Sequence, residues 1–466
     1  MKSSAPFDEW SSRWREDTPA NPADLTAWQL DRAWRVAETL AESNPYYRER
    51  VTLPSGRSAA EFRRLPLTRK GDVVADCEAH PPYGSRTVAD AADIRHFVET
   101  SGTSGQGREV YALDESDQAA IFRAEAVGFW WAGVRPGTTV LMTLPVGVSA
   151  AGQWYRGGLQ AIGANVISAG SYSTQTKVEL LRRFGAEVVV GTPSYLEKLA
   201  ASCVADGADL RQLGVRALVV AGEPYGPVWA ARVQERWGTT LYEQYGCTER
   251  IMAWTCPGGV LRDGRLAVLH VPAELAYWEV IDPETGEHVA DGESGELVST
   301  PLDAQASPLL RFATRDRVEY VAPGSCPCGR PLGGIRAGGV QRYDNMMKIR
   351  GVNMWPEMFD RVVLTVEGVR EYRGTVFDSF DGESILVEVE PLEGADGALG
   401  QAVRAAVRAA TSMTVQVTVL APGDIVGSVP AGFVKVSRWR DDRATAASAR
   451  DQHGTSSAKD ALSDRE

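Results

Sequence analysis

The chain has 466 residues, of which 44% are hydrophobic and 24% charged, and its formal net charge is −12. This length predicts two or more domains, and the composition is that of a globular protein. The negative charge excludes a broad nucleic-acid surface, and the lack of any run of about 18 apolar residues excludes a membrane-spanning helix.

The first residues and the cysteines indicate the compartment. The opening stretch, MKSSAPFDEWSSRW, contains no apolar core of a signal peptide. Six cysteines in a chain of this length do not form the dense pattern of a secreted, disulfide-rich domain. We therefore expect a protein of the reducing cytoplasm.

Two segments with different periodicity make up the first half of the chain. Residues 1–90 are predicted to form a helical N-terminal segment of a large domain, because apolar residues recur at helical spacing in LTAWQLDRAWRVAETLAE. From residue 138, buried strands alternate with helices of about ten residues, as in TKVELLRRFGAEVVVGTP. This alternation predicts an α/β fold with a mostly parallel sheet and helices on both faces. Ligands of such sheets bind beyond the carboxyl ends of the strands, where 191–193, AGEP (221–224) and YGCTE (245–249) lie.

The pattern changes again from about residue 268. AYWEVIDPETGEHVADGESGELVST predicts two strands joined by a turn, which suggests a smaller β unit. Short strands and helices after Arg342 predict a small, mobile α+β domain, and the small, polar and charged residues at the end predict a disordered tail. The expected division is 1–90 for the helical segment, 91–342 for the core, 343–443 for the small C-terminal domain and 444–466 for the tail.

A polar, glycine-rich loop, TSGTSGQG, occupies residues 100–107 after the apolar residues HFV. Its hydroxyls and backbone N–H groups suit a phosphate. It is not a Walker A loop, because Arg108 and Glu109 stand where Lys and Ser/Thr should follow, and its glycines do not have the dinucleotide-binding spacing. Taken alone, the pattern favours a plain surface turn.

Other segments change that interpretation. After TSGTSGQG come AGEP, YGCTE, PLLRFATRD (308–316), QRYDNMMKIRGVNMWP (341–356) and VPAGFVKVSRW (429–439). These six motifs, in this order, resemble those of the adenylate-forming superfamily of acyl-CoA synthetases, and most of all its phenylacetate–CoA ligase branch, from Tyr46 to Arg443. The resemblance implies that a carboxylate attacks ATP to give an acyl-adenylate, and that a thiol then displaces AMP. Such an enzyme needs no nucleophile of its own, so we expect catalysis by positioning and charge stabilisation.

The resemblance assigns roles to the residues that match its motifs. Thr248 would contact the α-phosphate, Glu249 would bind Mg²⁺, and Lys435 would stabilise charge during adenylation. Lys435 follows Val434 instead of the usual glycine, so a solvated surface lysine stays open. Asp344 would be the hinge between two half-reactions, with 348–353 facing the thiol in the second state. The predicted nucleotide-binding residues are Thr100, Ser101, Gly102, Thr103, Ser104 and Gly105 at the β- and γ-phosphates, Gly222, Glu223, Pro224 and Tyr245 at the adenine, and Asp316 and Arg342 at the ribose and nucleotide.

One departure concerns the phosphate loop. Gln106 stands where the family usually has Lys, so the grip on pyrophosphate is expected to be weaker unless Arg108 compensates.

The resemblance also nominates an acyl pocket. Its residues would be Trp154, Tyr155, Tyr195, Ala221 and Gly246. Aromatic walls suit a flat aromatic acid. Large aromatic residues lie equally often in the core, so that interpretation stays open, and the identity of the acid cannot be inferred.

A second group of residues, three cysteines and one histidine, is not required by this chemistry. Cys256, Cys326 and Cys328 lie in turns rich in Gly and Pro, and His270 lies in VLHVP. Three thiols and one imidazole suit a closed, tetrahedral structural zinc site, and similar positions occur in parts of the phenylacetate–CoA ligase branch. The spacing is not that of a standard finger, so unrelated reduced cysteines remain the alternative. Cys247 is expected to be a small lining residue.

The resulting prediction is an aryl- or arylacetyl-CoA ligase that uses ATP, Mg²⁺ and CoA and contains a structural Zn²⁺. Its partners would be an aromatic acid and CoA, with no nucleic acid or membrane, and a homodimer stays open. One alternative is an adenylating enzyme that loads a separate carrier protein. Others are a diazo-forming relative that activates nitrite and a silent, zinc-stabilised nucleotide-binding scaffold.

Overall fold

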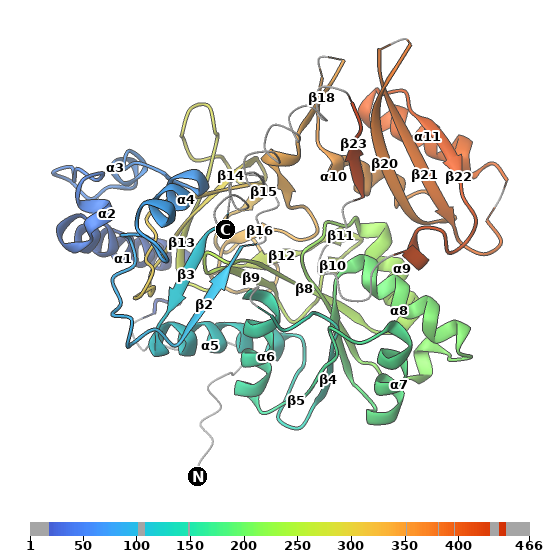
Figure 1. The fold of residues 1–466 in the computed structure, drawn as a ribbon, viewed down its shortest axis with the longest axis horizontal. Coiled ribbons are helices and arrows are strands. Elements are labelled where there is room, and N and C mark those ends of the chain that lie inside the picture. The colour runs from blue at the N-terminus through green and yellow to red at the C-terminus, as the bar shows by residue number, and fades with distance from the viewer. Residues whose placement is uncertain are drawn as a thin grey trace, which may run out of the picture. The chain divides into compact units, whose positions relative to one another are not determined.

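The computed structural model of the chain describes residues 18–100, 108–147, 150–350, 352–380, 382–395, 397–428 and 438–443. They form two compact units that meet in the sequence between Arg342 and Tyr343. Figure 1 shows the elements of both units in chain order.

The large unit is built on a thirteen-stranded sheet, parallel in one half and antiparallel in the other. The parallel half runs β5 (Asn165–Ser168), β4 (Thr139–Met142), β6 (Val188–Gly191), β7 (Ala217–Val220) and β8 (Thr240–Cys247). The antiparallel half continues through β9 (Ile251–Thr255), β12 (Val268–His270), β16 (Gly334–Arg336), β15 (Phe312–Val321), β14 (Ser294–Pro301) and β13 (Ala276–Ile281). Two short strands, β1 (Thr68–Arg69) and β17 (Gln341–Arg342), also pair with β15.

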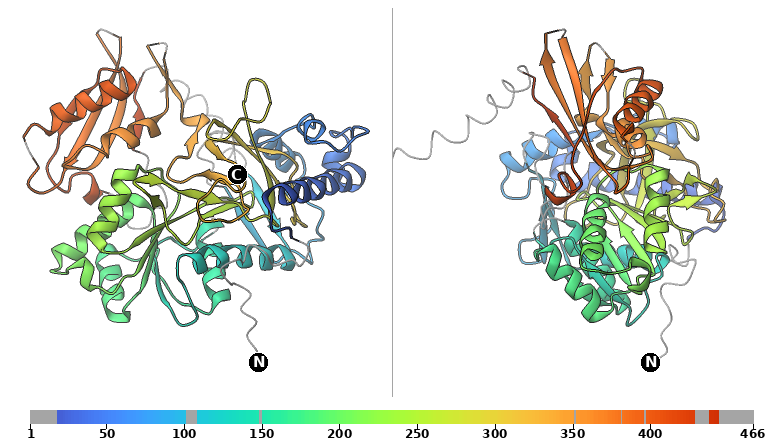
Figure 2. Two further views of the ribbon diagram at one scale, coloured as in Figure 1. Left: turned by 180° about the vertical axis from the view of Figure 1, so that it is seen from behind. Right: turned by 90° about the vertical axis from the view of Figure 1, so that its right-hand side faces the viewer.

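Helices cover both faces of the parallel half. The chain leaves β4 through α6 (Ala150–Ile162) to β5, and then reverses its direction across the sheet through α7 (Thr174–Phe184), α8 (Pro193–Ala205) and α9 (Pro227–Trp237). Because such crossovers are right-handed, the reversal places α6 opposite the other three helices. Figures 1 and 2 show this arrangement, with α5 (Glu115–Trp131) beside α6. The two strands β6 and β7 between the helical layers are apolar throughout, and Val188, Val189 and Val190 are fully buried.

The N-terminal helices belong to the large unit. They are α1 (Pro22–Ser43), α2 (Pro45–Arg48), α3 (Ala59–Arg63) and α4 (Lys70–Ala79). Of these, α1 and α3 contact β13, and α4 contacts β1 and β15. Phe62 contacts Trp34 and Tyr277 edge to face, with ring centroids 5.2 and 5.4 Å apart. Gln29 donates hydrogen bonds to the carbonyls of Ala273 and Ala276. Three short pieces complete this unit: the hairpin β2 (His96–Glu99)–β3 (Val110–Leu113), the hairpin β10 (Leu261–Arg262)–β11 (Arg265–Leu266) and a 3₁₀ turn at Leu210–Gln212.

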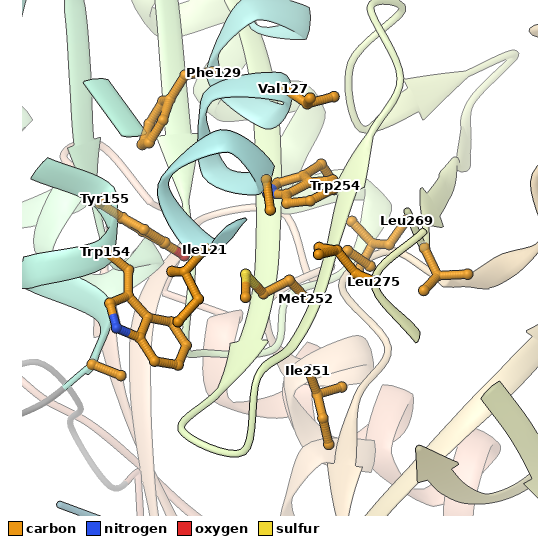
Figure 3. Packing of buried hydrophobic residues seen from close by; sticks show 14 of the residues in the cluster. Ile121, Val127, Phe129, Trp154, Tyr155, Ile251, Met252, Trp254, Leu269 and Leu275 are labelled. Atoms are coloured by element: carbon orange, nitrogen blue, oxygen red, sulfur yellow. The ribbon is translucent and has the colours of Figure 1, made fainter. Parts of the chain in front are cut away.

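The main hydrophobic core lies between the sheet and the α5–α6 layer. Figure 3 shows Trp154 and Tyr155 pointing from α6 into a cluster with Ile121, Met252 and Trp254. The two helices approach closely because α6 carries two glycines here. A Cβ on Gly158 would lie 2.5 Å from the Cβ of Glu125, so a larger residue would push the helices apart.

The small unit has an α+β fold with a four-stranded sheet, a two-stranded hairpin and two α-helices among its described residues. Its strands have the order β22 (Gln416–Val419), β21 (Gly382–Pro391), β20 (Val369–Ser379) and β23 (Trp439–Asp441). Its other elements are a 3₁₀ turn (Tyr343–Asn345), the hairpin β18 (Met347–Ile349)–β19 (Val352–Met354), α10 (Pro356–Val363), α11 (Leu399–Thr411) and a 3₁₀ turn at Val426–Ser428.

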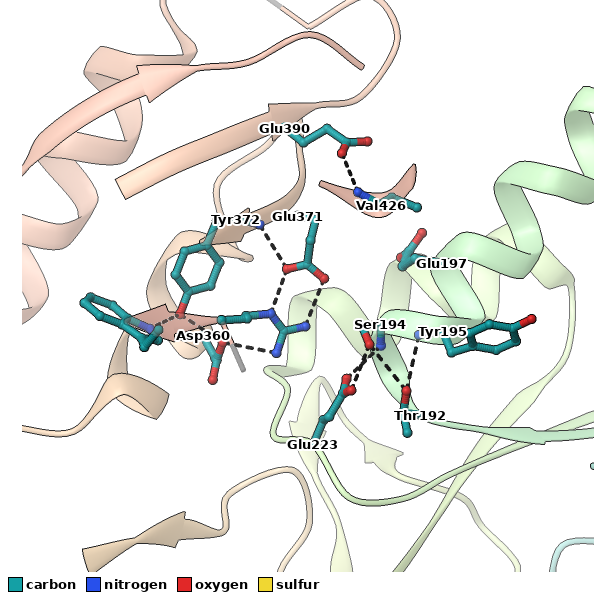
Figure 4. A network of polar contacts seen from close by, with 12 residues as sticks. Thr192, Ser194, Tyr195, Glu197, Glu223, Asp360, Glu371, Tyr372, Glu390 and Val426 are labelled. Atoms are coloured by element: carbon teal, nitrogen blue, oxygen red, sulfur yellow. Dashed lines mark hydrogen bonds and ion pairs between the residues drawn. The ribbon is translucent and has the colours of Figure 1, made fainter. Parts of the chain in front are cut away.

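A buried ion-pair network fixes β23 in the small unit. Arg438 donates two hydrogen bonds to the carboxylate of Glu371, at 2.7 and 3.0 Å, and lies 3.4 Å from Asp360. Tyr372 donates to Asp360 at 2.9 Å (Figure 4). The paired geometry of guanidinium and carboxylate fixes direction as well as distance. The last described strand is therefore held firmly to β20 and α10.

The predicted α/β class is confirmed by the parallel strands with helices on both faces. The strand–turn–strand predicted after residue 268 corresponds to β13 and β14, which extend the large sheet through β15. Among the helices of the described ranges, none has the length and apolar character needed to cross a membrane.

Glu125→Gln is expected to stabilise the large unit at alkaline pH. Burial raises the pKa of Glu125 from 4.5 to about 8. The folded state thus holds this proton more tightly than the unfolded state, and the resulting stabilisation is complete below pH 4.5 and is lost as the pH rises through 8. The loss is up to about 1.4 kcal/mol per pH unit in that window. Glutamine carries no charge and can still accept the hydrogen bond that Trp254 donates to Glu125.

The measurement is the midpoint of thermal unfolding of wild type and variant from pH 5 to 9. The advantage of Glu125→Gln should grow with pH, whereas Glu115→Gln, an exposed change on the same helix, should follow the wild type. Parallel curves for Glu125→Gln and wild type would contradict the prediction.

Candidate functional site

Three residues predicted to bind nucleotide lie together where β8, β15 and β17 meet. Asp316 on β15 and Arg342 on β17 are cross-strand partners, and the guanidinium donates to the Asp316 carboxylate at 2.8 Å. The hydroxyl of Tyr245, on β8, donates to the other carboxylate oxygen. Asp316 is 2% exposed. The hydrogen bonds from Tyr245 and Arg342 therefore fix the orientation of a buried carboxylate. Cys247 completes the group, with its sulfur 3.6 Å from Asp316, and burial raises the pKa of its thiol.

Thr248 and Glu249 lie in the tight turn between β8 and β9. Arg250 anchors this turn with a positive φ of 63°, by donating hydrogen bonds to Asp117 and Asp303. Burial first, and then the charge of Glu109, raise the pKa of Glu249 to about 8. Two carboxylates that repel one another in this way are relieved by a divalent cation, and Mg²⁺ takes one or two carboxylate ligands. The role of Glu249 as a magnesium ligand stays a prediction.

The base of the predicted phosphate loop is closed by Thr100 and Glu109. The Thr100 amide donates to the Glu109 carbonyl at 3.0 Å, and the Glu109 amide donates to the Thr100 hydroxyl at 3.0 Å. These bonds continue the β2–β3 ladder, in which Glu99 pairs with Val110. Ser101, Gly102, Thr103, Ser104, Gly105 and Gln106 lie outside the described residues.

In the AGEP segment, the Glu223 side chain has a structural role. Glu223 is buried and accepts hydrogen bonds from the Ser194 amide at 2.9 Å and the Ser194 hydroxyl at 2.8 Å, which fixes the start of α8 (Figure 4). Gly222 has a φ of 83°, a left-handed conformation that favours glycine. Any nucleotide contact from this segment is therefore expected from its backbone and from Pro224.

A neighbouring carboxyl links the residue after this segment to the loop between β16 and β17. Glu243 on β8 accepts hydrogen bonds from the Tyr225 hydroxyl and from the Gly338 amide, the latter at 2.7 Å. Burial raises the pKa of Glu243 to about 7. The sequence motifs did not identify Glu243, Arg250 or Glu109, because each acts through partners far away in the chain.

The predicted acyl-pocket residues do not form one cluster. Trp154 and Tyr155 are each 3% exposed and pack in the core between α6 and β9. Tyr195, also 3% exposed, lies on the other face, where its hydroxyl is 3.1 Å from that of Thr174. Ala221 follows β7, and Gly246 lies near the end of the neighbouring strand β8. Of these five residues, Ala221 and Gly246 lie closest along the sheet to the Tyr245 group.

The predicted C-terminal residues are only partly described. Asp344 is exposed in the first turn of the small unit. Lys435 lies outside the described residues, three positions before the anchored Arg438.

The four predicted zinc ligands lie together. Cys256 follows β9, His270 ends β12, and Cys326 and Cys328 lie in the turn between β15 and β16. Their ligand atoms all lie within 4.8 Å of one another, and the Cys328 sulfur is 3.4 Å from His270 Nε2. A Cβ on Gly334 would lie 1.9 Å from the Leu269 carbonyl, so this glycine permits β16 to approach β12. None of the six cysteines, all within the described ranges, forms a disulfide.

The chemistry of this cluster fits a structural zinc ion. Hydrogen bonds among the thiols lower the pKa of Cys328 and raise that of Cys326. Burial opposes protonation of His270, but its hydrogen bonds to Cys256 and Cys328 raise its pKa to about 9. Zinc binds thiolates and a neutral imidazole, so a zinc ion that binds here would displace protons from this cluster. A closed set of three sulfurs and one nitrogen leaves no open position, so it suits a structural rather than a catalytic metal.

Comparison with known proteins agrees with this geometry. Residues 32–300 match the family of AMP-binding enzymes. The chain is 30% identical over 352 residues to the phenylacetate-coenzyme A ligase of Thermus thermophilus, covering 74% of this chain and 76% of that protein. It is 29% identical to the phenylacetate-coenzyme A ligase of Pseudomonas putida, covering 78% and 82%. A crystal structure of 2-hydroxyisobutyryl-CoA ligase in the postadenylation state with 2-HIB-AMP has the same fold, with a TM-score of 0.81, 24% identity and coverage of 96% and 97%.

The chain therefore belongs to the family of AMP-binding enzymes. Within it, the chain is an AMP-forming acid–CoA ligase of the phenylacetate–CoA ligase-like branch, as the sequence motifs predicted.

Cys326→Ser is expected to remove a bound zinc ion. Serine supplies no thiolate, so the site loses one of four ligands. Elemental analysis of the purified wild type should find about one zinc per chain, and the variant should lose most of it and unfold several degrees lower. The rate of pyrophosphate release should change less than the stability. The control variant Cys203→Ser changes a buried cysteine outside the cluster, and it should retain the zinc ion. A wild-type protein without zinc would refute the site.

Proposed function

We propose that this protein is an aryl- or arylacetyl-CoA ligase that activates an aromatic acid with ATP and Mg²⁺ and transfers the acyl group to CoA. The observation that carries the proposal is the buried Tyr245–Asp316–Arg342 group beside the Glu249 turn. It joins a site for a ribose to a site for a cation at one edge of the sheet. The aromatic substrate is supported by the phenylacetate–CoA ligases that match about three quarters of the chain.

In this proposal the residues act by positioning. Asp316 accepts hydrogen bonds from the ribose hydroxyls, and Arg342 steers both that carboxylate and the nucleotide. Thr248 contacts the α-phosphate, and Glu249 holds the magnesium, which neutralises phosphate charge when bound. The base of the phosphate loop, from Thr100 to Glu109, presents hydroxyls and amides to the β- and γ-phosphates.

The small unit supplies the second part of the proposed mechanism. Lys435 bridges the substrate carboxylate and the α-phosphate during adenylation, and Asp344 is the hinge that exchanges it for the 348–353 segment before thioester formation. The proposed protein is cytoplasmic, and its Cys256–His270–Cys326–Cys328 site contains zinc.

Pyrophosphate release tests the substrate class. Wild-type protein, ATP and Mg²⁺ are incubated with aromatic acids, aliphatic acids or nitrite, with and without CoA. We expect release with an aromatic acid and a thioester only when CoA is present. Release with an aromatic acid but thioester only on a carrier protein would favour carrier loading. Release with nitrite alone would move the protein to diazo-forming chemistry, and nucleotide binding without any release would favour a silent scaffold.

Lys435→Ala is expected to separate the two half-reactions. The variant should lose about 100-fold or more in pyrophosphate release, because it lacks the charge that stabilises the transition state. Thioester formation from a supplied acyl-adenylate should stay within a few-fold of wild type. The two rates are measured in separate assays on the same preparation. An equal loss in both would contradict the exchange of Lys435 for the 348–353 segment. Arg440→Ala, an exposed change on β23, is the matched control.

A further inference from the structure

A buried ion pair lies beside the predicted phosphate loop and has no role in the assignments above. Lys70 Nζ is 3.1 Å from Glu109 Oε2. Glu109 is fully buried, and Tyr111 donates a hydrogen bond from its hydroxyl to Oε1 at 3.2 Å. A buried ion pair contributes little net stability, because desolvation of both charges offsets their attraction. Stability alone is therefore a poor reason for this pair.

Strand pairing brings Lys70 to the nucleotide side of the sheet. Lys70 begins α4 directly after β1, and β1 pairs in parallel with β15 so that Arg69 lies opposite Ala313. Lys70 therefore directly follows the last residue pair of these two strands, and Ala313 lies three residues before Asp316 on β15. Glu109, as described, closes the base of the phosphate loop. The ion pair thus lies between the strand of Asp316 and the start of that loop.

The loop itself supplies little positive charge. The stretch from Thr100 to Glu109 contains one basic residue, Arg108. Its guanidinium pairs with Glu99 at 2.8 Å, and its side chain is 62% exposed. A triphosphate is recognised through charge-assisted hydrogen bonds, and an ammonium is a common donor to it. The Lys70 side chain, 15% exposed, keeps partial access to solvent.

We propose that Lys70 binds the β- or γ-phosphate of ATP and that Glu109 is the positioning residue that holds its ammonium there. An ammonium has three donors, so it can serve Glu109 and a phosphate oxygen at once. The inference rests on the proposed adenylation function. Because only ATP carries these phosphates, Lys70 acts on ATP and on departing pyrophosphate, and not on bound AMP.

The experiment compares two nucleotides in the absence of any acid or thiol. Dissociation constants for ATP and AMP, each with Mg²⁺, are measured by calorimetry for wild type, Lys70→Ala and Lys70→Arg. Lys70→Ala should weaken ATP about 10- to 100-fold, the usual effect of losing a charged hydrogen bond, and leave AMP within about twofold. Lys70→Arg should recover part of the ATP affinity. Arg216→Ala, which removes an ion pair with Glu187 at the opposite edge of the parallel strands, should change neither constant.

A double variant separates a loss of ATP binding from a loss of folding. Lys70→Ala leaves the Glu109 charge buried and unpaired, which can unfold the protein. Lys70→Ala/Glu109→Gln removes both charges and should show the same selective loss of ATP affinity. Equal losses for ATP and AMP, or no loss for either, would overturn the inference while leaving the aromatic-acid ligase proposal standing. Selective loss of ATP affinity in the variants, combined with a wild type that activates no aromatic acid, would overturn that proposal and leave the inference standing.

Discussion

The site depends on one constraint, the change of strand direction at β8. This strand pairs in parallel with β7 and antiparallel with β9. Its carboxyl end therefore lies at the edge where the loops after the parallel strands are found. The same end pairs with the first strand of the antiparallel half. Next to this junction, the Tyr245 hydroxyl on β8 donates a hydrogen bond to Asp316 in the middle of β15. The Glu249 turn follows directly, so one strand leads to both the residues proposed for the ribose and the residue proposed for the cation.

Two buried carboxylates of the large unit are each paired with a cation. Asp316 and Glu109 are both deeply buried and both paired with a cation from a neighbouring strand or helix. In each case a short strand that pairs with β15 positions the cation. Arg342 lies on β17, and Lys70 directly follows β1. The same long strand leads into the turn with Cys326 and Cys328. β15 is thus the scaffold on which three separate polar centres are ordered.

Local pattern predicts some of this and cannot predict the rest. The alternation of apolar strands with helices was sufficient for the fold class, because burial on both faces makes β6 and β7 apolar throughout. The four zinc ligands could be proposed from residue type and turn context. Periodicity does not give partners, however, so the pairing of Thr68 with Phe312 had no signal in the sequence. For the same reason the burial of Trp154 in the core and the hydrogen bonds of Glu223 to Ser194 appear only in three dimensions.

The junction between the two units has a mechanical consequence. β17 is two residues long and ends at Arg342, whose guanidinium is bonded to Asp316, and the small unit begins with the next residue, Tyr343. The hinge that we propose at Asp344 therefore lies two residues along the chain from Arg342. A rotation about the backbone of Asp344 changes no dihedral angle of Arg342 or Asp316. The proposed exchange of Lys435 for the 348–353 segment thus requires no break in the Asp316–Arg342 hydrogen bond.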